Sequence, residues 1–189
     1  MSSGKKEGVA VYIDGSNTYN KLKTLGMPEA TKRFDYARFV AHLVGERHLV
    51  SQRYYIGVVR NYDGSATGES RVKKQQSFLE GLRATGFEVK LGRIMYDDPG
   101  RIREKGVDVK LSVDLVVGAA DNFYDTAIVI SSDTDLIPAI KYISSGKKKA
   151  TEYVSFAGSP SLGMIKECNT QRLFSKEDLM PFQTDKKTP

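Results

Sequence analysis

Two aspartates follow predicted strands at positions where a carboxylate could bind a cation. "GVAVYID" predicts a buried strand over 8–14 that ends on Asp14, and "TAIVISS" predicts another over 126–132 that is followed by Asp133 and Asp135. A folding domain gains little from placing like charges where strands reach the surface. These residue types therefore indicate a cation site. Turn residues are the alternative for Asp14 and Asp133, because "DGSN" is turn chemistry.

Two further aspartates belong to the segment before the second of these strands. Asp108 lies in "EKGVD", which leads into a helix predicted around "VKLSVDLVVGAA", and Asp114 follows six residues later. Six residues turn an ideal helix by about 240°, so the two carboxylates share a face only if Asp108 lies in the first turn, outside the regular helix. An N-cap at Asp108 and a solvated helix position at Asp114 are the alternatives.

Oxygen ligands of this kind favour Mg²⁺ or Mn²⁺ over zinc or copper. Carboxylates that converge without enough cationic side chains repel one another, and a bound cation relieves that repulsion. His42 and His48 lie on a different predicted helix, and Cys168 is the single cysteine, so neither a histidine base nor a cysteine zinc site is indicated. A carboxylate-held Mg²⁺ can activate a water and stabilise a phosphodiester transition state.

The order of the predicted elements indicates how the aspartates come together. Strands are predicted at five positions with helices between them: 8–14, 53–59, 87–94, 126–132 and 151–158. Alternating strands and helices indicate an α/β fold with a doubly wound, mostly parallel five-stranded sheet of the Rossmann-like kind. If the first strand lies beside the fourth, Asp14 and Asp133 meet in one crevice at the carboxyl edge of the sheet.

Length and composition are consistent with one domain over 8–182, with flexible ends at 1–7 and 183–189. No apolar run approaches the roughly 20 residues that cross a bilayer, and "MSSGKKEG" lacks the apolar region of a signal peptide, so we expect a cytoplasmic protein. The formal net charge of +6 favours polyanionic partners.

Four segments between about residues 8 and 160 carry a resemblance to a known family in their order and spacing. They read "VYIDGSN", "KGVDVKLSVD", "IVISSDTDLIPAI" and "GKKKATEYVSF". This ordered set resembles the NYN domain, a branch of the PIN-like nucleases with a Rossmann-like parallel sheet. The sequence departs from the family pattern at Ser132, where the family usually has glycine, and at Leu136, where it usually has phenylalanine.

The resemblance implies a metal-dependent nuclease centre and an RNA substrate. The acidic residues that match the family's centre are Asp14, Asp108, Asp114 and Asp133, with Asn17 and Asp135 nearby.

Basic side chains around the acidic loop are candidates for contacts with the RNA backbone. Arg101, Arg103 and Lys105 cluster there, and phosphates need such cations beside an anionic centre. Tyr62 and Tyr96, near predicted strand ends, could stack on unpaired bases, with packing roles as the alternative.

The sequence therefore predicts an Mg²⁺- or Mn²⁺-dependent endoribonuclease that acts on RNA. The first alternative is a catalytically inert RNA-binding or scaffolding module that keeps the acidic pocket. A phosphatase ranks below both. "VISSDTDL" resembles the strand followed by Asp-x-Asp of aspartate-nucleophile phosphatases, but in those enzymes the motif normally opens the first strand, and here it falls at the fourth predicted strand. The sequence leaves open whether the protein forms a homodimer.

Overall fold

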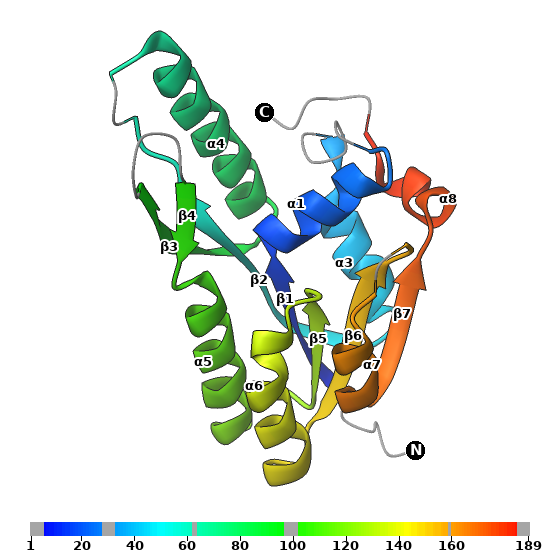
Figure 1. Cartoon of the computed structure of the whole chain (residues 1–189). Helices are drawn as coiled ribbons and strands as arrows, with labels where there is room; N and C mark the ends of the chain where they lie inside the picture. The colour runs from blue at the N-terminus through cyan, green and yellow to red at the C-terminus, as the bar shows by residue number, and fades with distance from the viewer. Residues whose placement is uncertain (1–5, 28–32, 62–63, 97–101, 159, 185–189) are drawn as a thin grey trace.

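Seven strands form one sheet in the computed structural model, which describes residues 6–27, 33–61, 64–96, 102–158 and 160–184. Their order across the sheet is β4-β3-β2-β1-β5-β6-β7 (Figure 1). Six strands are parallel, and β4 pairs antiparallel with β3. The strands are β1 (Gly8–Asp14), β2 (His48–Val58), β3 (Glu88–Tyr96), β4 (Ile102–Lys105), β5 (Thr126–Ile130), β6 (Ala150–Phe156) and β7 (Thr170–Phe174).

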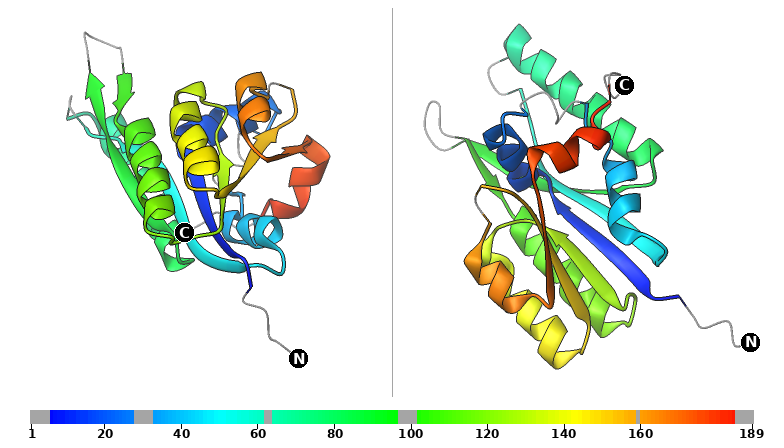
Figure 2. Two further views of the ribbon diagram at one scale, coloured as in Figure 1. Left: turned by 90° about the horizontal axis from the view of Figure 1, so that it is seen from below. Right: turned by 90° about the vertical axis from the view of Figure 1, so that its right-hand side faces the viewer.

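Helices cover both faces of this sheet and create two apolar cores (Figure 2). One face is packed by α1 (Gly15–Thr24), α3 (Tyr36–Val44), α4 (Ala66–Ala84), α8 (Lys176–Leu179) and η3 (Met180–Phe182). The other is packed by α5 (Val107–Ala120), η1 (Thr134–Leu136), α6 (Ile137–Lys141), η2 (Tyr142–Gly146) and α7 (Leu162–Glu167). Because both faces are covered, all five residues of β5 are buried, which explains its uninterrupted apolar sequence.

The doubly wound arrangement predicted from the sequence is confirmed. The chain proceeds outward from β1 through β2 and β3, then returns to the other side of β1 and continues through β5, β6 and β7. The predicted neighbourhood of the first and fourth predicted strands is therefore also correct, since β1 pairs with β5. The reversal of strand order between these two strands creates the crevice in which such sheets bind their ligands.

The strand count of five was wrong because two edge strands carry little apolar signal. β4 has the sequence "IREK" and lies in a segment that reads as a polar loop, but it pairs with β3 from Arg93↔Lys105 to Tyr96↔Ile102. β7, "TQRLF", is mostly exposed and pairs only with β6. An edge strand is held by backbone pairing on one side, so it does not need an alternating apolar pattern.

Helix α1 was also missed, because its first residues read as a turn. It begins directly after β1, and α4 begins at Ala66 inside a Gly/Ser-rich segment. Pro138 stands in the first turn of α6, where proline is tolerated because its missing amide hydrogen would have no partner in the helix. Among the described residues, no helix is both long and apolar enough to cross a membrane.

Candidate active site

Asp14 stands at the carboxyl end of the central strand. Ile13 pairs with Ile130 in the register between β1 and β5, so Asp14 and Ser131 leave the sheet side by side. Asp14 is also the N-cap of α1, where its Oδ1 accepts a hydrogen bond from the Asn17 amide over 3.0 Å. This cap gives the carboxylate a set orientation at the start of the crevice.

The abrupt change from β1 to α1 depends on the missing side chain of Gly15. A Cβ atom at this position would lie 2.5 Å from the Cε1 atom of Tyr54 in the neighbouring strand β2. Glycine therefore lets the helix start directly over the sheet edge, which keeps Asp14 and Asn17 close together.

Hydrogen bonds across the switch point connect Asp14 with the segment after β5. The buried hydroxyl of Ser131 donates to Asp14 Oδ2 over 2.9 Å and accepts from the Asp133 amide over 3.2 Å. The side-chain oxygen of Asn17 accepts from the Ser132 amide over 3.1 Å. Ser131 and Asn17 therefore connect the segment "VYIDGSN" with the segment "IVISSDTDLIPAI".

Ser132, which stands where the family usually has glycine, is anchored to the next strand. Its Oγ lies 2.8 Å from the Tyr153 hydroxyl and 3.0 Å from the Ser155 hydroxyl, both on β6. The Tyr153 hydroxyl also accepts from the Ser161 amide, at the N-cap of α7. The departure from the family pattern therefore adds polar contacts behind the site.

Asp133 and Asp135 differ in their surroundings. Asp133 is half-buried, lines the crevice and caps η1, since its Oδ1 accepts from the Asp135 amide over 2.9 Å. The side chain of Asp135 is exposed and does not line this pocket. Asp133, and not Asp135, therefore supplies the cap of this turn.

Asp108 brings a third carboxylate into the crevice from α5. Gly106, the N-cap of this helix, has a φ of 76°, a left-handed conformation that favours glycine. The turn it makes directs the chain from β4 into α5, with Asp108 in the first helical turn. The resulting pocket of about 280 Å³ is lined by Asp14, Ser16, Asn17, Asn20, Val107, Asp108 and Asp133.

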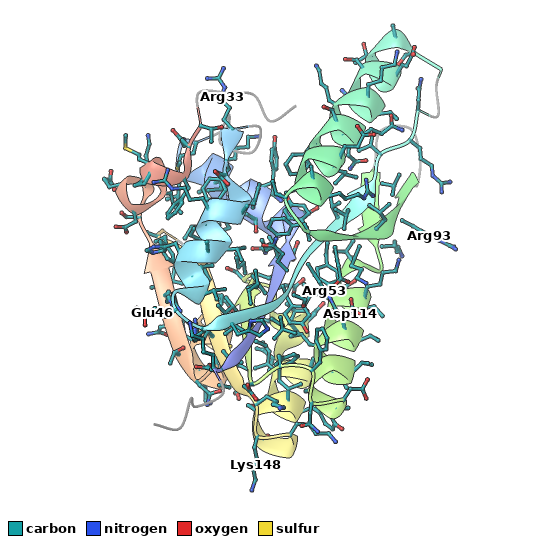
Figure 3. The ribbon with its side chains drawn as sticks, turned by 180° about the vertical axis from the view of Figure 1, so that it is seen from behind. Arg33, Glu46, Arg53, Arg93, Asp114 and Lys148 are labelled. Carbon is teal, nitrogen blue, oxygen red and sulfur yellow. The ribbon has the colours of Figure 1, made fainter. Side chains whose placement is uncertain are left out.

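Asp114 lies outside this pocket, at another face of α5 (Figure 3). Its Oδ2 accepts a hydrogen bond from the Tyr55 hydroxyl over 2.7 Å and lies 3.5 Å from Nη1 of Arg53. Burial raises the pKa of Tyr55 far above its ordinary value, so this phenol stays protonated and donates. The structure therefore brings Asp14, Asp108, Asp133 and Asn17 together, and places Asp114 against β2 instead.

The donor set of the crevice fits a hard divalent cation. Among the described residues, no three Asp, Glu, His or Cys side chains gather closely enough to hold an ion by themselves. Mg²⁺ does not need such a cage, because it usually binds one or two carboxylates and completes its shell with waters and substrate phosphates. Asp14 and Asp133, which both line the pocket, supply the two carboxylates that such a site needs.

Other titratable candidates lie elsewhere in the fold. His42 packs its ring against Phe174 and Phe182. Burial raises the pKa of the Cys168 thiol to about 11, which keeps it protonated and unreactive near neutral pH.

The predicted RNA contacts are only partly within the described structure. Arg101 and Tyr62 lie outside the described residues, while Arg103 and Tyr96 are described by their backbone pairing alone. Lys105 is exposed at the end of β4, three residues before Asp108. Its contact with RNA stays a prediction.

A doubly wound parallel sheet with polar side chains gathered at its switch point defines a Rossmann-like α/β protein whose candidate ligand site lies at the carboxyl edge. The profile of the NYN domain matches residues 8–174, which is most of the chain. The chain therefore belongs to the NYN domain family, a branch of the PIN-like nucleases.

A crystal structure of a protein of unknown function from Vibrio parahaemolyticus has a similar fold. It has a TM-score of 0.70 and 24% sequence identity, and the similarity covers 95% of this chain and 100% of that chain. No curated protein matches the chain.

Proposed function

We propose that this protein is an Mg²⁺- or Mn²⁺-dependent endoribonuclease that hydrolyses phosphodiester bonds of RNA in the crevice between β1 and β5. The observation that carries the proposal is the convergence of Asp14, Asp108 and Asp133 from three separate segments on one pocket. Membership of a nuclease family supports the same reaction class.

Each carboxylate has a separate role in this proposal. Asp14 and Asp133 hold the cation, and Ser131 keeps the two correctly placed through its bonds to both. When bound, the cation supplies a Lewis acid that activates water and offsets the charge of the phosphoryl transition state. Asp108 lines the pocket from the first turn of α5, and in this proposal it accepts a proton from the attacking water.

Asn17 acts as a positioning residue in the same proposal. Its backbone amide binds Asp14 while its side-chain oxygen binds the Ser132 amide, so it connects both sides of the crevice.

The proposed reaction is an attack of water on the phosphodiester. The water oxygen forms a bond to phosphorus, the bond to the leaving ribose oxygen breaks, and the two RNA fragments separate. Lys105 and the net positive charge favour retention of the polyanionic substrate.

Cleavage of a mixed RNA pool tests the proposal. We expect cleavage by the wild-type protein with Mg²⁺ or Mn²⁺, none with a chelator, and none by Asp133→Asn. Asp135→Asn is the matched control, because it makes the same chemical change two residues away on an exposed side chain and should leave measurable cleavage.

RNA affinity at fixed salt distinguishes the alternatives. Wild-type protein that binds RNA but never cleaves it, with either metal, would identify an inert RNA-binding module. Undiminished cleavage by Asp133→Asn would overturn the assignment of the site.

A further inference from the structure

Helix α4 extends past the carboxyl edge of the sheet, the edge that carries the candidate active site (Figures 1 and 2). Its fully buried residues, Leu79, Gly81 and Leu82, all lie in its last turns. Residues 66–77, here named the α4 arm, therefore project from the body of the protein. Most of the stability of a helix in a protein comes from packing of an apolar face, so the packing of the core does not explain the length of this arm.

Polar contacts hold the α4 arm in place at both of its ends. The Ser65 hydroxyl accepts a hydrogen bond from the Gly68 amide over 3.0 Å and caps the start of the helix. Near the other end, Gln75 donates to the Gly57 carbonyl and accepts from the Val59 amide, each over 2.8 Å. The arm is therefore a preorganised surface, and a ligand that binds it does not have to order it.

Two cationic side chains of the α4 arm have no counter-charge. The ammonium of Lys73 lies 2.7 Å from a carboxylate oxygen of Glu69, so these two residues neutralise each other. Arg71 and Lys74 are exposed, and within the part of the chain that the structure describes neither forms an ion pair. The unpaired positive charge of the arm therefore belongs to Arg71 and Lys74.

Arg71 and Lys74 lie on the flank of α4 that is turned toward the start of α1. Phe78 follows them after seven and four residues, so the three side chains share one flank. The Phe78 ring packs against Tyr54, with ring centroids 5.6 Å apart, and the Tyr54 ring lies against Gly15, the first residue of α1. Lys74 and Arg71 therefore stand about 6 Å and 10 Å further along the helix than this contact beside the crevice.

We propose that the α4 arm binds the phosphate backbone of the RNA strand that occupies the crevice, an inference that rests on the proposed nuclease function for its ligand. The crevice is lined by the carboxylates of Asp14, Asp108 and Asp133, which repel phosphates. Cations outside the crevice are needed to hold such a substrate. A strand that leaves the crevice beside the start of α1 passes Lys74 first and Arg71 one turn further on, and each contact releases a condensed counterion.

The composition of the α4 arm predicts that it contacts the backbone and not the bases. Its sequence, "ATGESRVKKQQS", contains no aromatic residue on which a base could stack. Contacts with phosphates fix the position of a strand but carry no sequence information. The arm should therefore add affinity for RNA of any sequence.

The salt dependence of RNA binding tests this inference. Fluorescence anisotropy measures the affinity for labelled single-stranded oligouridine and oligoadenosine, without divalent metal so that the RNA stays intact. We expect Arg71→Gln/Lys74→Gln to weaken the binding of both oligonucleotides at least several-fold and by the same factor. The slope of log affinity against log salt should become shallower by about 0.7 for each lost phosphate contact.

Two control variants carry the same kind of charge removal elsewhere. Lys73→Gln changes the same helix, but at the side chain that is paired with Glu69, and should keep the wild-type slope. Lys148→Gln/Lys149→Gln removes two charges from the segment before β6, at the opposite end of the sheet (Figure 3), and matches the double variant in net charge. Glutamine has nearly the helix propensity of lysine and arginine, so α4 itself should be unaffected.

Cleavage kinetics separate this inference from the proposed function. In an active nuclease the double variant should raise KM with little change in kcat, because the arm holds substrate and transition state alike. RNA binding with the expected change of slope, but no cleavage by the wild type, would support the arm and overturn the nuclease. Cleavage by the wild type with an unchanged slope in Arg71→Gln/Lys74→Gln would overturn the arm and keep the nuclease. An equal change of slope in Lys148→Gln/Lys149→Gln would also overturn the arm, because it would reflect net charge alone.

Discussion

The hydroxyl of Ser131 donates a hydrogen bond to Asp14 Oδ2 over 2.9 Å, between residues 117 positions apart in the chain. The same hydroxyl accepts from the amide of Asp133. One buried side chain therefore sets the relative positions of two carboxylates at the point where the strand order reverses.

Replacement of Ser131 by alanine should disturb both stability and the site. Because the change removes the donor to Asp14 and the acceptor for Asp133, we expect the free energy of unfolding to fall by about 1–3 kcal/mol. Metal-dependent cleavage should fall as well. Urea unfolding and cleavage rates measure the two effects, with Ser145→Ala on the exposed end of η2 as the control. A Ser131→Ala protein equal to wild type in both would show that the bridge is dispensable.

Divalent metal should stabilise the folded protein. At a free Mg²⁺ or Mn²⁺ concentration ten times the dissociation constant, binding to the native state contributes about 1.4 kcal/mol. We expect thermal melts to show this gain in the wild type, a chelator to reverse it, and Asp133→Asn to lack it. Equal melting temperatures with and without millimolar metal in the wild type would count against a cation site.

Asp114 and Asp108 should respond to substitution in opposite ways. Asp114→Asn removes one of the two carboxylates beside the largely buried Arg53, the other being Glu88, and weakens the hydrogen bond from Tyr55, so we expect a loss of about 1–3 kcal/mol in unfolding free energy with the metal-induced gain retained. Asp108→Asn, as the matched change at the crevice, should abolish cleavage with little loss of stability. If Asp114→Asn unfolded with the same free energy as the wild type but was no longer stabilised by metal, Asp114 would belong to the metal site and not to the contact with β2.

Stability should fall steeply above pH 10. Burial raises the pKa of Tyr12, Tyr55 and Tyr124 well above the ordinary value, so the unfolded chain releases these protons at a lower pH than the native protein does. The native state then binds more protons, and each tyrosine lowers the unfolding free energy by about 1.4 kcal/mol per pH unit above pH 10.

Urea unfolding between about pH 8 and pH 11 measures this effect. Tyr124→Phe should show a shallower decline, while Tyr19→Phe on the exposed side of α1 should decline like the wild type. Identical slopes for all three proteins would exclude the buried tyrosine as the cause.

Much of the fold could be predicted from the sequence, because short apolar runs that alternate with amphipathic helices leave few arrangements of a parallel sheet. The runs at 8–14 and 126–132 identify the strands whose carboxyl ends carry Asp14 and Asp133, and the predicted neighbourhood of these strands is correct. In contrast, β4 and β7 form through backbone pairing at the sheet edges, which leaves almost no trace in side-chain patterning.

The sequence by itself placed Asp108 and Asp114 in one motif, but tertiary structure separated their surroundings. Six residues rotate the side chain by about 240° around the helix, so one aspartate at the start of α5 lines the crevice while the other meets β2. Which of them lines the crevice was decided by packing: Gly106 sets the start of α5, and Tyr55 and Arg53 offer Asp114 a hydrogen bond and a charge that a local sequence pattern does not contain.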